Sequence, residues 1–304
     1  MADRGSPDLV ASFFTLTGAG FGEPPRYSFA QRCEAAAAAG FAGIGLHIED
    51  LARTRQAGTN SVEMRALLRS CGLRLVEIEF VGGWALSDPD ADPARSASGG
   101  ASDSADLPDP LRRTLAEVED VADAHGGRHV SAGEFRGGAE WSLDPDAAAS
   151  RLRAFAGRLA GRELLVAVEA FPWSAIPDVD CAVDLLRRAA APNAGLLIDV
   201  WHFYNGGAKL DVLDDLPGAG VAAVQLNDGP LVDGDFLKHA RAQRKLPGEG
   251  ELDVVGLIRA VQATGYSGPY CVEVNTPEFR ARPVDEAAQR AADAATAALS
   301  AAAG

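Results

Sequence analysis

Cysteine is scarce in this sequence, and its spacing is as informative as its number. The four cysteines, Cys33, Cys71, Cys181 and Cys271, lie far apart, and no two of them form a C-x-x-C pair. Such spacing provides neither a zinc knuckle nor a disulfide framework. We therefore expect four ordinary buried thiols.

Positive charge is also in deficit. The 304 residues include 28 Lys and Arg against 43 Asp and Glu, which gives a formal net charge of -15 at pH 7. Proteins bind nucleic acid mainly by neutralising phosphates with clustered Lys and Arg, and no basic run here is longer than two residues. The composition therefore disfavours a nucleic-acid partner and predicts a solvated acidic surface.

The apolar run nearest the N-terminus is short. Residues 9–18, "LVASFFTLTG", fall well below the roughly 20 residues that span a bilayer, and the polar "MADRGSPD" before them lacks the basic leader of a secretory signal. We expect this run to form a first strand in a cytoplasmic protein that has no membrane partner.

The sequence does contain a regular alternation of two patterns. Short apolar runs rich in β-branched residues are separated by Ala-rich segments with apolar residues at helical spacing, several of which end at a glycine. The candidate strands are residues 9–16, 43–47, 73–80, 128–133, 163–170, 194–200, 221–226 and 269–274. Eight strands with helical crossovers predict a parallel, closed (β/α)₈ TIM barrel rather than an open sheet.

We expect the whole chain, residues 1–304, to form one domain, in which the barrel spans about 9–278. The glycine-rich fingerprint of a dinucleotide fold is missing after the first candidate strand. Residues 86–110 are poor in apolar side chains and rich in Asp, Ser, Ala and Pro, which predicts a flexible insertion after the third strand. Residues 283–302 predict an Ala-rich helix that packs outside the barrel or mediates homo-oligomer formation.

Four polar residues stand at matching positions late in consecutive candidate strands: Glu169, Asp199, Gln225 and Glu273. The carboxyl ends of barrel strands converge on one pocket. Three carboxylates crowded there would repel one another unless a cation neutralised them. Three carboxylates and an amide oxygen are hard ligands, so the pattern predicts a site for one divalent ion, Mn²⁺ ahead of Mg²⁺ or Co²⁺.

The motifs "VEAF", "IDVWH", "VQLND", "PGEGELD" and "GYSGPYCVEV" resemble those of the xylose isomerase-like barrel superfamily, often called sugar phosphate isomerases/epimerases. The resemblance runs from about Phe29 to Glu278. It implies that Glu169, Asp199, Gln225 and Glu273 bind one divalent metal and that His202 faces the substrate. Many epimerases of the group have His where this chain has Gln225, and the Gln is more typical of the 3-dehydroshikimate dehydratase branch.

Such a site predicts removal of a carbon-bound proton next to a carbonyl, through an enediolate, with Glu169 and Glu273 as the acid/base pair. Returning the proton gives a sugar isomerase or epimerase, the reaction we place first. Loss of a neighbouring hydroxyl instead gives a lyase, similar to a 3-dehydroshikimate dehydratase, a keto-inositol dehydratase or a C-glycoside-cleaving subunit. A partner subunit without catalysis is disfavoured because all three acidic ligands are present.

The expected substrate is a small sugar, cyclitol or hydroxy-keto acid. Candidate substrate-binding residues are His47, Trp84, Glu134, His202 and Arg244, the last because it can pair with a phosphate or carboxylate. A nuclease on the same scaffold would need a His-rich multi-metal site and a basic groove, and the sequence, with five histidines and its acidic balance, shows neither.

Overall fold

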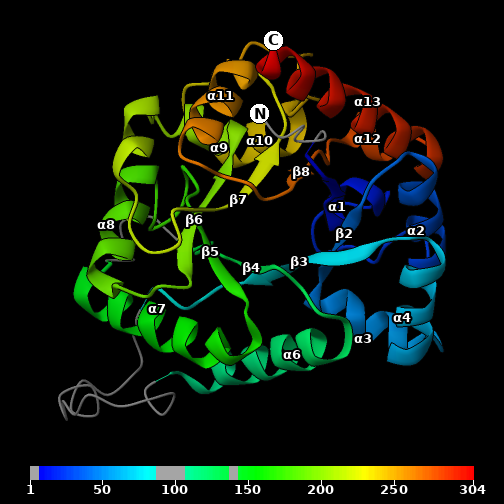
Figure 1. The fold of residues 1–304 in the computed structure, drawn as a ribbon, viewed down its shortest axis with the longest axis horizontal. Helices are drawn as coiled ribbons and strands as arrows, with labels where there is room; N and C mark the ends of the chain where they lie inside the picture. Colours follow the sequence, from blue (N-terminus) through cyan, green and yellow to red (C-terminus); the bar gives the residue numbers. More distant parts are fainter. Residues whose placement is uncertain (1–6, 87–106, 137–142) are drawn as a thin grey trace.

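The computed structural model describes residues 7–86, 107–136 and 143–304. Eight parallel strands close into a barrel in sequence order, β1 to β8, with β1 paired to β8 (Figure 1). The strands are β1 (Leu9–Ala11), β2 (Gly43–His47), β3 (Arg74–Val81), β4 (His129–Ala132), β5 (Leu165–Glu169), β6 (Ala194–Asp199), β7 (Val221–Leu226) and β8 (Tyr270–Val272). The predicted (β/α)₈ barrel is confirmed.

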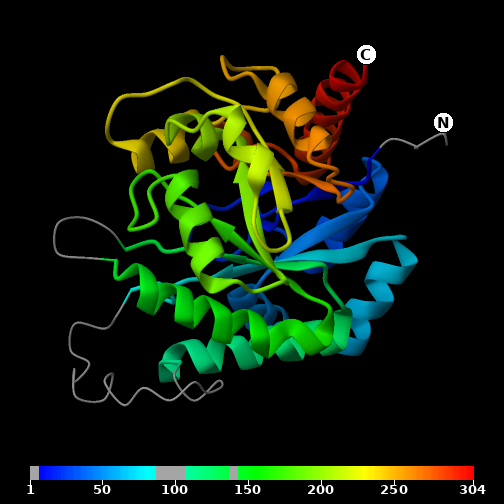
Figure 2. The ribbon, with the colours of Figure 1, turned by 60° about the vertical axis from the view of Figure 1, so that its left-hand side comes forward.

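Helices surround the strands (Figure 1). They are α1 (Phe13–Leu16), α2 (Phe29–Ala38), α3 (Ile48–Gln56), α4 (Ser61–Ser70), α6 (Asp109–His125), α7 (Pro145–Leu159), α8 (Val179–Ala189), α9 (Val200–Asn205), α10 (Phe236–Gln243), α11 (Val254–Ala263), α12 (Pro277–Arg280) and α13 (Val284–Ala303), with short 3₁₀ turns at Ala160–Arg162 and Leu210–Asp215. In Figure 2, α6 and α7 run along the same side of the barrel, where Arg158 pairs with Glu119. Their apolar stripes face the strands and form one continuous core.

The first predicted strand, residues 9–16, is wrong in its second half. The strand ends at Ala11, and the Ser12 side chain then accepts a hydrogen bond from Phe14 N, which caps the short helix α1. The continuous apolar run in "LVASFFTL" concealed this change because strand and helix residues there are both buried. Serine at a helix N-cap was the available local signal.

Most of the predicted insertion at 86–110 lies outside the described residues. Its two ends depart from the prediction. Leu86 and Leu107 are each 2% exposed, and α6 begins at Asp109. Leu107 belongs to the main hydrophobic core, so the insertion is shorter than predicted.

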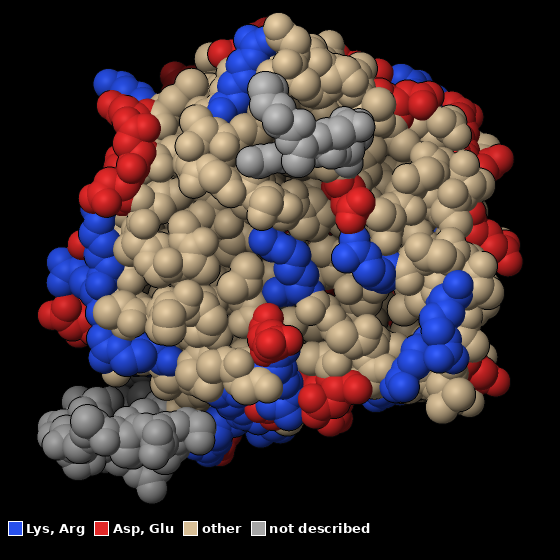
Figure 3. Space-filling model, in the orientation of Figure 1, with Lys and Arg blue, Asp and Glu red and all other residues tan. Residues whose placement is uncertain are grey.

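The predicted C-terminal helix is present as α13, which packs against α2 and α11. None of the helices in the described residues has the length and apolar composition needed to span a bilayer. On the face in Figure 3, Lys and Arg side chains lie in small groups among Asp and Glu.

Candidate active site

A cavity opens where the carboxyl ends of the barrel strands meet. Its apolar wall is aromatic, made of Phe14, Phe21, Phe80, Phe135, Phe171 and Trp173. Its polar side chains include His47, Glu79, Ser131, Glu169, His202, Gln225, Arg244 and Glu273. A flat or ring-shaped molecule would therefore have rings to pack against and polar groups along one side.

Three buried side chains at this end of the barrel lie close enough together to hold one metal ion. Glu169 ends β5, Asp199 ends β6, and His202 follows three residues later on α9. Each offers one atom to a group in which all atoms lie within 4.8 Å, and all three residues are buried. The barrel geometry thus brings together side chains that are far apart in sequence.

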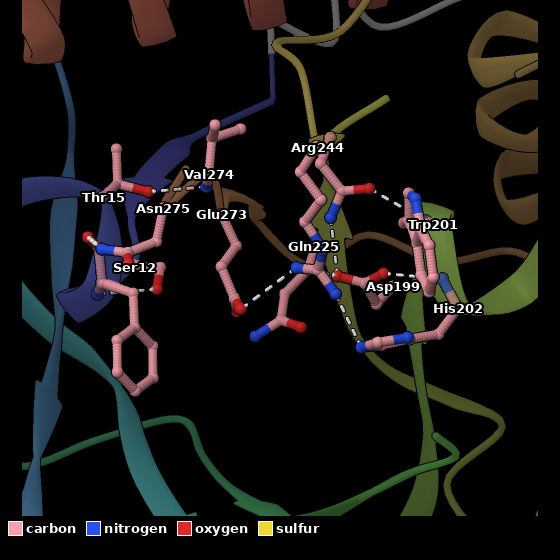
Figure 4. A network of polar contacts seen from close by, with 12 residues as sticks. Ser12, Thr15, Asp199, Trp201, His202, Gln225, Arg244, Glu273, Val274 and Asn275 are labelled. Carbon is pink, nitrogen blue, oxygen red and sulfur yellow. Dashed lines mark hydrogen bonds and ion pairs between the residues drawn. The ribbon is translucent and has the colours of Figure 1, made fainter. Parts of the chain in front are cut away.

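Arg244 connects this group to Glu273 (Figure 4). Its Nη1 lies 3.1 Å from Asp199 Oδ2 and 3.2 Å from Glu273 Oε1. Its Nη2 lies 2.6 Å from His202 Nε2. The guanidinium of Arg244 thus supplies positive charge among the carboxylates.

Burial and mutual repulsion act on the acidic groups of the site. Burial, with the charges of Glu273 and Asp199, raises the pKa of Glu169 well above its usual range. Burial also raises the pKa of Asp199, although Arg244 opposes it, and raises that of Glu273 to about 8. Crowded carboxylates with raised pKa values are what a bound cation would stabilise in ionised form.

Asn227 and Asp228, in the motif "QLND" at the end of β7, hydrogen-bond to the end of β6, to the loop at 248–252 and to Lys245. Asn227 donates from Nδ2 to Asp199 Oδ2 at 2.6 Å and accepts from Trp201 N, so it fixes the end of β6. Asp228 accepts backbone hydrogen bonds from Gly248, Gly250 and Leu252, and so holds the loop that follows Arg244. Asp228 also forms two backbone hydrogen bonds with Lys245, which places Arg244 beside the carboxylates.

Gln225 contacts a further buried carboxylate, that of Glu77 on β3. Its Nε2 donates to Glu77 Oε1 at 3.0 Å, and His129 and Ser131 also reach this oxygen. Burial alone would raise the pKa of Glu77, but the hydrogen bond and charge of His129, with other donors, lower it to about 2. Gln225 Oε1 is buried and has no hydrogen-bond partner within the described parts of the chain.

The structure does not bring every predicted residue to the cavity. His47 lines it, but Trp84 is fully buried in the hydrophobic core, and the Glu134 carboxylate bonds Arg136 beside it. The prediction that Trp84 and Glu134 bind the substrate is therefore not supported, because neither lines the cavity. Sequence reasoning missed Glu77, Asn227 and Asp228, although the "ND" after Gln225 was a polar pair at a strand end.

The family model for the xylose isomerase-like TIM barrel matches residues 33–298. The chain belongs to this family. The family assignment confirms the resemblance inferred from the motifs and covers most of the chain.

Curated relatives of this xylose isomerase-like barrel fall into two groups. A 3-dehydroshikimate dehydratase from Pseudomonas aeruginosa is 38% identical over 141 residues, which are 46% of this chain and 22% of the relative. An inosose isomerase from Bacillus subtilis is 25% identical over 120 residues, which are 40% of this chain and 42% of the relative. The alignments thus span less than half the length of these relatives.

Among solved structures, one described as the IolI protein with a bound zinc atom has a TM-score of 0.78. The alignment covers 96% of this chain and 98% of the other at 14% identity. At that identity the likeness establishes the shared barrel fold. The metal belongs to that structure.

The donor set of this family member suits a divalent cation. Glu169, Asp199 and Glu273 are buried carboxylates, and Gln225 contributes an unpartnered amide oxygen at the same end of the barrel. All four are oxygen donors of the kind that Mg²⁺ and Mn²⁺ prefer. The residues therefore fit the group that the sequence pattern predicts.

Proposed function

We propose that this chain is a divalent-metal-dependent enzyme that removes a carbon-bound proton next to a carbonyl on a small polyhydroxy ketone. The convergence of Glu169, Asp199 and His202 in one buried group, with Glu273 joined to it through Arg244, carries the proposal. We propose Glu169, Asp199, Gln225 and Glu273 as ligands and Mn²⁺ as the ion.

When bound, a divalent ion would polarise the substrate carbonyl and stabilise the resulting enediolate. Glu169 or Glu273 takes the proton, because both are carboxylates facing the cavity from separated strands. Arg244 and His202 hold substrate oxygens, since both line the cavity at its polar side. The aromatic wall packs against the carbon skeleton and excludes water.

We propose dehydration of a cyclic hydroxy ketone as the reaction, ahead of the isomerisation that the sequence placed first. Gln225 and the 38% identity to a 3-dehydroshikimate dehydratase support this choice. In this reaction the carbon–hydrogen pair of electrons forms a new C=C bond as the neighbouring C–O bond breaks. The departing hydroxyl takes a proton from the second carboxyl group and leaves as water.

Isomerisation or epimerisation remains the second candidate because two carboxylates, Glu169 and Glu273, face one cavity. One could remove a proton and the other return one to the substrate. The inosose isomerases among the relatives support this alternative.

The test uses the metal-free protein reconstituted with Mn²⁺ and offered 3-dehydroshikimate or inosose in deuterated water. Dehydration of 3-dehydroshikimate leaves a dihydroxybenzoate, which ultraviolet absorbance detects, whereas isomerisation of inosose incorporates deuterium at a carbon atom without loss of water. We expect Glu169→Gln and Glu273→Gln each to lower the rate by about 10²–10⁴-fold. Turnover that persists in both variants, or in EDTA, would exclude the proposed mechanism.

A further inference from the structure

A buried carboxylate lies just below the candidate metal site, on a strand that supplies none of its ligands. Glu77, on β3, is fully buried. Its Oε1 receives contacts from His129 Nε2 at 3.2 Å, Ser131 Oγ at 3.2 Å and Gln225 Nε2 at 3.0 Å. Its Oε2 accepts from Cys271 Sγ at 3.2 Å. Four side chains from three other strands thus converge on this single carboxylate.

The contact with Gln225 determines which end of the amide faces the cavity. An ionised carboxylate accepts hydrogen bonds and donates none, so it bonds the NH₂ end of an amide and not the oxygen. With Nε2 held at Glu77, Gln225 Oε1 is left buried without a partner among the residues described. An unpartnered buried oxygen costs free energy unless a ligand uses it.

The opposite orientation would be unfavourable on both sides. Turning the amide would place Gln225 Oε1 against Glu77 Oε1, so that two acceptors would face each other. It would also direct the NH₂ group toward the cavity, where a nitrogen that carries two hydrogens cannot ligate a cation. The choice between these orientations depends on Glu77, since the amide can adopt either.

We propose that Glu77 is a positioning residue that holds the Gln225 amide with its oxygen toward the metal. The inference rests on the proposed metal site, which it deepens. His129 and Ser131 support it by donating to the same carboxylate oxygen and thereby holding Glu77 in place. Partners of this kind, one step removed from the ion, commonly change metal affinity by 10–100-fold when mutated.

The first experiment measures Mn²⁺ affinity by titration calorimetry on the full chain after EDTA treatment and dialysis. We expect Glu77→Gln to weaken binding by about 10–100-fold, because an amide at 77 can pair with either end of Gln225. The matched control is Glu119→Gln, on α6. Glu119 pairs with Arg158 and Arg162 outside the cavity, so the control should bind Mn²⁺ as the wild type does.

The second experiment exchanges donor and acceptor. In a Gln225→Glu background, Glu77 faces a second carboxylate, and Glu77→Gln now replaces repulsion with an amide that donates to position 225. We expect Glu77→Gln to strengthen Mn²⁺ binding in this background, although it weakens binding in the wild type. A role limited to folding would give no such reversal of sign.

Glu77→Asp covers the case in which Glu77→Gln does not fold. The shorter side chain keeps the charge but withdraws the carboxylate from Gln225, so we expect a loss of about tenfold in affinity with melting still cooperative. Asp199→Ala separates the two hypotheses. If it abolishes Mn²⁺ binding while both Glu77 variants bind normally, the positioning role is overturned. If Asp199→Ala also binds normally, the metal site itself is wrong.

Discussion

Arg244 Nη2 lies 2.6 Å from His202 Nε2, and this contact determines the protonation state of the imidazole. Arginine only donates, so His202 Nε2 must accept and the ring proton lies on Nδ1. Burial, followed by the charge of Arg244, lowers the pKa of His202 well below its usual range. The His202 side chain, which lines the cavity, is therefore a neutral imidazole.

The neutral state of His202 predicts how stability depends on pH. Below its ordinary pKa of about 6.5, the unfolded chain gains a proton that the folded protein does not, so the free energy of unfolding falls as pH falls. We expect the metal-free wild type to lose about 1 kcal/mol more than His202→Gln between pH 6.5 and 5.5 in urea unfolding. Parallel pH curves for wild type and His202→Gln would contradict the assignment.

Arg244 should affect metal affinity and activity in opposite directions. In Arg244→Gln the carboxylates of Asp199 and Glu273 lose the guanidinium that lies 3.1 and 3.2 Å from them. A metal ion then no longer competes with a resident cation, so we expect Mn²⁺ to bind at least about tenfold more tightly, or 1.4 kcal/mol. Turnover should nevertheless fall because the substrate loses a hydrogen-bond donor. Calorimetry and steady-state kinetics on the same samples measure affinity and turnover. Weaker Mn²⁺ binding by Arg244→Gln would show that Arg244 does not compete with the metal ion.

Asp228 should control the loop that follows Arg244. Asp228→Ala removes acceptors for Gly248, Gly250 and Leu252, and a buried donor without a partner costs about 1–3 kcal/mol. We expect a lower melting temperature and faster amide hydrogen exchange in residues 245–252. Asp253→Ala, which removes only the cap bond to Gly256 N, is the matched control and should leave exchange in that loop unchanged. Equal exchange of residues 245–252 in both variants would show that the Asp228 side chain does not hold this loop in place.

Leu107 should behave as a core residue although it lies in a segment that the sequence assigned to an insertion. Its side chain is 2% exposed, so Leu107→Ala should lower the free energy of unfolding by about 2–5 kcal/mol. Leu231→Ala provides the comparison, because Leu231 is 62% exposed and its truncation should cost little. Similar urea midpoints for the two variants would support the predicted insertion at 86–110, with Leu107 inside it.

The sequence predicted the barrel well because its two periodicities alternate cleanly eight times. The late strand positions of Glu169, Asp199 and Gln225 followed from that pattern alone. Trp84 was predicted to line the cavity but lies in the core. The sequence pattern cannot distinguish these two positions, because a tryptophan just beyond a strand end can turn either way.

The role of Glu77 was beyond sequence reasoning. Its importance comes from contacts with His129, Gln225 and Cys271, which are 52, 148 and 194 residues away. In sequence it alternates with Glu79 in "LRLVEIEF" and resembles an ordinary strand residue with a polar face. Closure of the barrel is what makes it central, and closure has no local signature.

Trp173 gives the cavity an optical reporter of its own. Its indole stacks on Phe171 at a centroid distance of 5.3 Å and meets the His202 ring edge-on at 5.0 Å, whereas Trp84 and Trp201 are sealed in the core. A ligand that packs against this indole should change its emission, because Trp173 lines the cavity. Intrinsic fluorescence can therefore screen unlabelled candidate substrates directly, and comparison with Trp173→Phe identifies the part of the change that comes from Trp173.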